Sequence, residues 1–299
     1  METAAYVAVA AALATRAPLL ASVVGLMVLG ILHNVLELRY VLARWSGSFT
    51  GSFRWVVLGL VTLIALTRLA GPAGRRAEVV AGFAVLAAGM AYGARRRPVL
   101  AAAGLPAVLV AGAVAWQHLD HYFVAVTYLH NLVPFVFLWD WSARRPAGPA
   151  RAAFRAVQVA WLLVVPALLL GGVLPVPSIG AQAGAVAFAG PTEGHVAVVA
   201  PPAWRGPEAA RLLAVFAFLQ VLHYVFWCWF LPRNAERRVR TPRVAWAATA
   251  ALAAVFAYGY APAWTGTKLA YVSLASYHAY VEYAVLALVV FRPKEKEAP

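Results

Sequence analysis

The sequence predicts an all-α protein, a polytopic transmembrane helical bundle of about nine helices, with a range of seven to nine. The chain has 299 residues, of which 63% are hydrophobic and only 12% charged. Soluble domains are far less apolar, at about 45–50%. The apolar residues also fall into long runs that are separated by short Gly, Pro and Arg segments. An integral membrane protein is therefore expected.

Nine apolar runs approach the roughly 20 residues that a helix needs to cross the hydrocarbon core. Breaks between the runs carry turn-forming or basic pairs, such as Gly71-Pro72 and Thr241-Pro242, which cannot continue a helix easily. The residues before Pro18 lack a basic signal-peptide region and are expected to form a short interfacial lead-in. The predicted spans are Leu19–Ala43, Trp55–Leu69, Ala77–Gly93, Pro98–Gln117, Leu119–Trp141, Phe154–Leu174, Leu212–Leu231, Val244–Ala261 and Leu269–Phe291.

Basic residues predict the orientation, because cytoplasmic loops carry an excess of Lys and Arg. Most of the 25 Lys and Arg residues fall on one side if the N-terminus is outside and the C-terminus inside. The segment Arg68–Arg76 departs from this rule. We expect one membrane-embedded domain over residues 1–299, an external loop or lid at 175–207 and a cytoplasmic tail at 292–299. The predicted location is the cytoplasmic membrane of a prokaryote, and His195 in the loop is expected to be solvated.

The formal net charge of +14 does not indicate nucleic-acid binding, because the cations form short clusters between apolar runs. Cys228 is the single cysteine, which excludes an intrachain disulfide and a CxxC metal site. The sequence also lacks the G-x-x-x-x-G-K-[ST], H-E-x-x-H and G-x-S-x-G motifs. Nucleotide-binding loops, zincin proteases and serine hydrolases of those types are therefore not expected.

Four histidines lie at matching depths in four different predicted spans: His33, His130, His223 and His278. Each precedes a charged inner boundary by 10 to 14 residues. At about 1.5 Å per residue this is roughly 15–21 Å, near the middle of the bilayer. All four spans run in the same direction in the predicted topology, so the imidazoles can meet in one layer. Ionisable groups at this depth are costly and usually have a function, although each could also be a plain interhelical hydrogen-bond partner.

Two of these histidines are followed four residues later by a glutamate, Glu37 and Glu282. This spacing places imidazole and carboxylate on one helical face. Such donors suit iron, zinc or manganese, and the glutamates are either ligands or groups that orient the histidines. Further polar groups expected near the same level are Asn34, Asn131 and Gln220.

A second polar cluster, His118, Asp120 and His121, falls where the fourth span turns into the fifth. It is either an interfacial polar turn or an outer-shell group, gate or proton entry point. Aromatic residues near the histidines could line a cavity for an apolar substrate or simply pack the helices. These aromatics are Tyr122, Tyr128, Tyr224, Phe226, Trp227, Tyr277 and Tyr280.

Two elements resemble motifs of the bacterial and archaeal Brp/Blh-type β-carotene 15,15'-dioxygenases, which are multi-pass membrane proteins. The segment His33–Glu37 is similar to their H-G-x-x-D element, with Asn for Gly and Glu for Asp. The segment His278–Glu282, followed by Phe291-Arg292-Pro293, is similar to their last histidine-acid element and terminal F-R-P. The middle element reads His118-Leu119-Asp120-His121, and His223 alone replaces a histidine pair. The resemblance implies a non-haem iron enzyme and a carotenoid-like substrate.

The favoured function is a membrane-embedded non-haem iron (Fe²⁺) oxygenase or oxidase acting with O₂ on a lipid-like or isoprenoid substrate. The histidines and the two glutamates would form its metal centre. Two alternatives use the same histidine layer. One is a haem-binding electron-transfer protein, and the other is a proton-coupled or metal-ion transporter.

Overall fold

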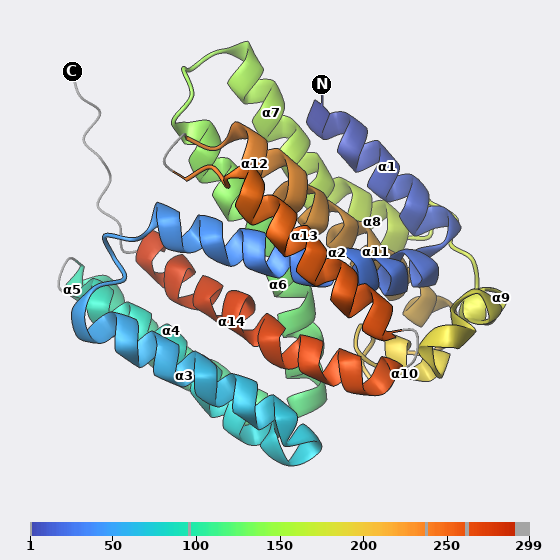
Figure 1. Ribbon diagram of the computed structural model, residues 1–299, viewed down its shortest axis with the longest axis horizontal. Coiled ribbons are helices and arrows are strands. Elements are labelled where there is room, and N and C mark those ends of the chain that lie inside the picture. The colour runs from blue at the N-terminus through green and yellow to red at the C-terminus, as the bar shows by residue number, and fades with distance from the viewer. Residues whose placement is uncertain (1, 95–96, 237–238, 261–262, 291–299) are drawn as a thin grey trace. The chain divides into compact units, whose positions relative to one another are not determined.

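The computed structural model describes residues 2–94, 97–236, 239–260 and 263–290. These residues form helices joined by short connections, and no strand occurs among them (Figure 1). The predicted all-α class is therefore confirmed. The motif Phe291-Arg292-Pro293 and the tail at 292–299 lie outside the described residues, as do Arg95 and Arg96.

Eight helical stretches of the described chain are long and apolar enough to cross a membrane, which agrees with the predicted range. The eighth predicted run, Val244–Ala261, corresponds to α13 (Arg243–Tyr260), which begins on a charged residue and is not among the eight. The eight are α2 (Pro18–Arg44), α3 (Gly51–Leu69), η1 with α4 (Gly71–Ala94), α5 (Pro98–Gln117), α6 (Leu119–Ala143), α7 through α8 (Pro149–Leu170), α11 through α12 (Gly206–Asn234) and α14 (Trp264–Val290).

The chain divides into two compact units. The first unit comprises Met1–His33, Asp120–Ala235 and Arg243–Trp264, and the second comprises Asn34–Leu119, Glu236–Pro242 and Thr265–Pro299. The boundary between His33 and Asn34 falls inside the continuous helix α2.

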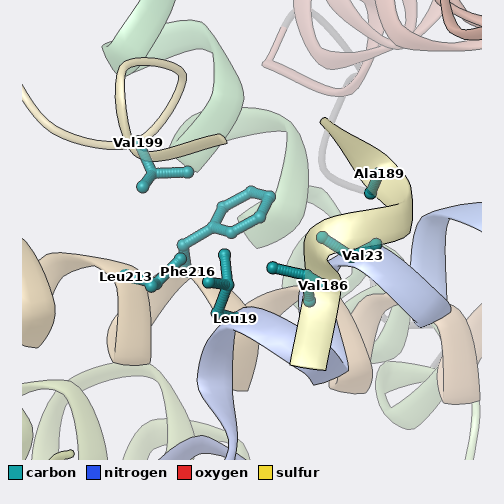
Figure 2. Close-up of a cluster of buried hydrophobic side chains, with 7 residues drawn as sticks. All are labelled: Leu19, Val23, Val186, Ala189, Val199, Leu213 and Phe216. Atoms are coloured by element: carbon teal, nitrogen blue, oxygen red, sulfur yellow. The ribbon is translucent and has the colours of Figure 1, made fainter. Parts of the chain in front are cut away.

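In the first unit, helix α1 (Glu2–Arg16) occupies the predicted lead-in and packs against α11 (Gly206–Val225). Near the start of α2 lies a cluster of seven buried apolar side chains (Figure 2). Removing such side chains from water is the main favourable contribution to the free energy of folding. Where lipid surrounds the helices, close packing of these side chains contributes to helix association. The cluster consists of Leu19, Val23, Val186, Ala189, Val199, Leu213 and Phe216.

The segment predicted as a loop at 175–207 contains three short helices: α9 (Ile179–Gln182), η3 (Ala183–Ala189) and α10 (Thr192–Val196). Three of its apolar residues belong to the buried cluster of Figure 2. The expectation that His195 is solvated is wrong. Its ring is half-buried, with Nε2 3.1 Å from the carbonyl oxygen of Ala189 and its centroid 5.6 Å from that of Trp264.

Two π-helical turns interrupt the spans of the first unit, at Ala160–Val164 and Phe226–Phe230. Each is followed by a proline, Pro166 or Pro232. A proline has no N–H and its ring clashes with the carbonyl four residues earlier, and a widened turn relieves that conflict. Such turns are frequent at functional sites, and the second begins three residues after His223.

In the second unit, α4 (Arg75–Ala94) packs against both α3 and α5 (Figure 1). It also approaches α14 closely, because a Cβ added at Gly89 would lie only 2.7 Å from the Cβ of Ala287. Small residues allow helices in membranes to come this near. Only 6% of the apolar window of α5 is buried, which fits a helix that faces lipid.

The segment Arg68–Arg76 is an exception to the predicted distribution of positive charge, and one of its arginines belongs to a buried ion pair in the second unit. Arg68 donates from Nε and Nη2 to Oε1 of Glu78, at 3.0 and 2.6 Å. The hydroxyl of Tyr280 donates to the same oxygen at 2.6 Å. Arg68 also donates to the carbonyl oxygen of Val272 at 3.2 Å. This arginine is therefore neutralised within the protein and adds little to the charge asymmetry that sets orientation.

Candidate metal centre

His33 comes from the middle of α2 and is 1% exposed. Its Nδ1 lies 3.0 Å from the carbonyl oxygen of Leu29, one turn earlier in the same helix. A nitrogen that donates to a backbone carbonyl fixes the tautomer and leaves Nε2 as the acceptor. The imidazole is thus prepared to offer Nε2 to a metal.

Three histidines of the first unit form a compact triad. The ring centroids of His130 and His223 lie 4.4 Å apart, those of His33 and His223 5.0 Å apart, and those of His33 and His130 6.3 Å apart. His223 is 1% exposed, and His130 is half-buried. Three imidazoles from α2, α6 and α11 therefore meet inside a helical unit, as their matched depth predicted.

Aromatic and amide groups surround the triad. The ring of Tyr224 lies 4.5 Å from that of His33, and the amide nitrogen of Gln220 donates to the Tyr224 hydroxyl at 2.8 Å. The indole of Trp227 lies 6.4 Å from His223. Asn131 is buried, but its amide nitrogen bonds the carbonyl oxygen of Thr127 at 2.8 Å within its own helix. The triad has an environment that excludes bulk water.

In the second unit, His278 and Glu282 lie one turn apart on α14 and are 3% and 0% exposed. The carboxyl group of Glu282 lies close enough to interact with that of Glu37, which is also 0% exposed. Glu37 in turn lies one turn beyond His33 on α2. Glu37 and Glu282 therefore connect the two H-x-x-x-E segments, one on α2 and the other on α14.

Three side chains of the first unit could hold a metal ion: His33, His130 and His223. Each offers one ring nitrogen, and these nitrogens lie within 4.8 Å of one another. Donors bound to one ion at about 2.0–2.2 Å can be at most about 4.4 Å apart, so the three need to move by only a few tenths of an ångström. In the second unit, Glu37 and His278 likewise offer ligand atoms within 4.8 Å of each other. Imidazole and carboxylate donors suit iron, zinc or manganese.

Other predicted site residues lie elsewhere or have different partners. Glu282 lies close to Glu37 in the second unit and is not itself a member of a possible metal-binding group. Asn34 is buried on α2 beside His33. The side chains of His118, Asp120 and His121 are exposed at the junction of α5 and α6. Their exposure favours the interpretation of that cluster as a polar turn.

Several aromatics predicted as cavity residues have structural contacts. The hydroxyl of Tyr128 donates toward the carbonyl oxygens of Val199 and Leu212, at 3.0 and 2.8 Å. Tyr277 shares a hydrogen bond of 2.9 Å with Thr62 on α3. Tyr122 packs on Phe123, and Phe226 on Trp161. A substrate cavity formed by these rings therefore stays a prediction.

The sequence does not predict two features, the pairing of Arg68 with Glu78 and a cavity beside Arg211. Its only signal for either is an arginine near the end of an apolar run. No protein-family model matches the chain, and neither a characterised protein nor a solved structure does. The evidence for function is therefore the residues and their geometry.

Proposed function

We propose that this protein is a membrane-embedded non-haem iron oxygenase or oxidase that acts on a lipid-like or isoprenoid substrate. The observation that carries the proposal is the triad of His33, His130 and His223, whose ring centroids are 4.4 to 6.3 Å apart. Buried imidazoles with an adjacent carboxylate form the donor set of many O₂-activating iron sites. The resemblance to the Brp/Blh-type dioxygenases agrees with this class.

The residues of the chain would perform distinct tasks. The three histidines would hold the ion, and Glu37, one turn beyond His33 on α2, would complete the donor set. Glu282 would orient the carboxyl group of Glu37, with which it interacts. Removing an outer partner of this kind commonly lowers metal affinity by about 10–100-fold. Iron at the site supplies the activation of O₂, while the apolar helices keep out bulk water and orient the substrate.

The geometry of the triad counts against haem. A haem lies as a flat macrocycle between its two axial ligands. In this site the ring of His223 lies only 4.4 and 5.0 Å from the other two rings. A macrocycle placed between His33 and His130 would collide with it.

The test is metal analysis of the full chain purified in detergent. We expect near-stoichiometric iron, no Soret absorption, and O₂ uptake on addition of a conjugated isoprenoid. The double variant His33→Gln/His223→Gln should lose the iron. The matched control His118→Gln/His121→Gln, which changes two exposed histidines, should keep it. A wild-type protein without bound metal, or a Soret band, would overturn the proposal, and metal flux in proteoliposomes without O₂ uptake would favour a transporter.

A further inference from the structure

A cavity of about 560 Å³ lies in the first unit, between the end of α8 (Val165–Leu170) and the start of α11. Its size is in the range of small-molecule sites. Most of its wall is apolar, from Leu174, Val176, Ile179 and Ala210. One candidate membrane span ends beside the cavity at Leu170, and another begins beside it at Gly206. A cavity at the ends of membrane spans is expected at the level of the lipid headgroups.

One cation lines this cavity, Arg211 on the second turn of α11. Its Nη1 donates to the carbonyl oxygen of Leu170 at 3.3 Å, and it forms no ion pair with the residues that the structure describes. A guanidinium has five N–H donors, so most of its donors remain available. An unneutralised arginine beside an apolar wall fits a ligand with an anionic group and an apolar chain.

The absence of a side chain at Gly172 leaves the space that the Arg211 guanidinium occupies. Gly172 has a φ of +72°, and a Cβ there would lie only 2.7 Å from Nη2 of Arg211. Any other residue would be strained and would displace the arginine. Close in sequence to the lining residues Gly172 and Gly206 are a largely exposed Val173 and a half-exposed Trp204. Tryptophan is enriched where protein meets the headgroup region.

We infer that this cavity binds a membrane amphiphile with a phosphate or carboxylate headgroup, held by Arg211, with its acyl or isoprenoid chain along the apolar wall. The inference is independent of the proposed metal chemistry. From Arg211 to His223 are 12 residues along α11, or about 18 Å at the rise of an α-helix. The two sites are thus separate on the same helix.

The test is native mass spectrometry of the delipidated full chain, titrated with phosphatidylglycerol, phosphatidylcholine or inorganic phosphate. We expect phosphatidylglycerol to bind more tightly than phosphatidylcholine. Arg211→Gln should weaken phosphatidylglycerol binding by about tenfold, as expected for the loss of a charge-assisted hydrogen bond. Arg205→Gln removes a nearby exposed arginine that does not line the cavity, and it should stay within about twofold of the wild type.

A second pair of variants tests the cavity without changing charge. Gly180 lines the cavity and a Cβ there meets nothing within 4 Å, so Gly180→Leu should fold and fill the space. Gly184→Leu, also in open space but outside the cavity lining, is its control. Equal phosphatidylglycerol binding by the two cavity variants, Arg211→Gln and Gly180→Leu, and by their two controls would overturn the inference. Displacement of phosphatidylglycerol by millimolar inorganic phosphate would instead indicate a free-anion site. Iron content should not change in any of the four, which separates this test from that of the metal centre.

Discussion

His130 on α6 and His223 on α11 bring their ring centroids to 4.4 Å, the shortest of the three distances within the histidine triad. The rings are inclined by 57° and are therefore not stacked. Two tilted imidazoles at this distance inside an apolar unit can direct nitrogens to one point. This pair, which lies in a single compact unit of the chain, is the firmest part of the proposed metal centre.

His223→Gln should abolish stoichiometric metal binding, because it removes the ring that lies nearest to both other members of the triad. The loss of one ligand typically lowers metal affinity by more than the about 10–100-fold seen for outer partners. The measurement is metal content by plasma mass spectrometry after dialysis. His118→Gln, at an exposed position, serves as control. Metal retention by the His223 variant at the wild-type level would contradict the assignment of this residue as a ligand.

The sequence predicted the helical class and the layer of histidines because both depend on short-range regularity. Span length follows from runs of apolar residues, and the depth of His33 or His223 follows from a constant rise per residue. The H-x-x-x-E spacing likewise places Glu282 one turn from His278 without reference to any other helix.

Contacts between distant segments could not be predicted in this way. The bond from Tyr280 to Glu78 joins residues 202 positions apart, and no local pattern marks one as the partner of the other. For the same reason Tyr128 was assigned to a possible substrate cavity, although its hydroxyl is used by two backbone carbonyls. The His195 interaction with Ala189 depends on short helices in a segment that the sequence indicated only as a loop.

Arg68→Gln should destabilise the protein by roughly 3 kcal/mol, because it leaves the Glu78 carboxylate buried without its cation. Glu78 has only 4% of its side chain exposed, and it accepts two hydrogen bonds from Arg68. The measurement is thermal unfolding in detergent, followed by circular dichroism. Arg76→Gln is the matched control, since this exposed arginine packs over the ring of Trp116 and surface changes are usually within about 0.5 kcal/mol. Equal melting temperatures for the two variants would show that the ion pair contributes nothing.

Gly89→Ala should destabilise the second unit by about 1–3 kcal/mol, the usual range for overpacking. The new methyl group would lie 2.7 Å from the Cβ of Ala287 and 3.4 Å from the carbonyl oxygen of Ala284, so α4 and α14 must move apart. Gly59→Ala on α3 meets nothing within 4 Å, and it should be neutral or stabilising by about 0.5–1 kcal/mol. Chemical unfolding of the two variants side by side provides the comparison. A Gly89 variant as stable as the Gly59 variant would refute the close approach of α4 and α14.

Tyr128→Phe should loosen the segment at 175–207 while leaving the metal centre intact. The hydroxyl of Tyr128 reaches the carbonyl oxygens of Val199 and Leu212, so it fastens the end of this segment to α6 and α11. Loss of the bond should cost about 1 kcal/mol and raise local opening about fivefold. The measurement is the rate of tryptic cleavage after Arg205, together with iron content. Tyr122→Phe, at a half-buried ring that packs on Phe123, should leave the cleavage rate unchanged. If the Tyr128 variant resists trypsin as well as the wild type does, the hydroxyl is not what holds this segment in place.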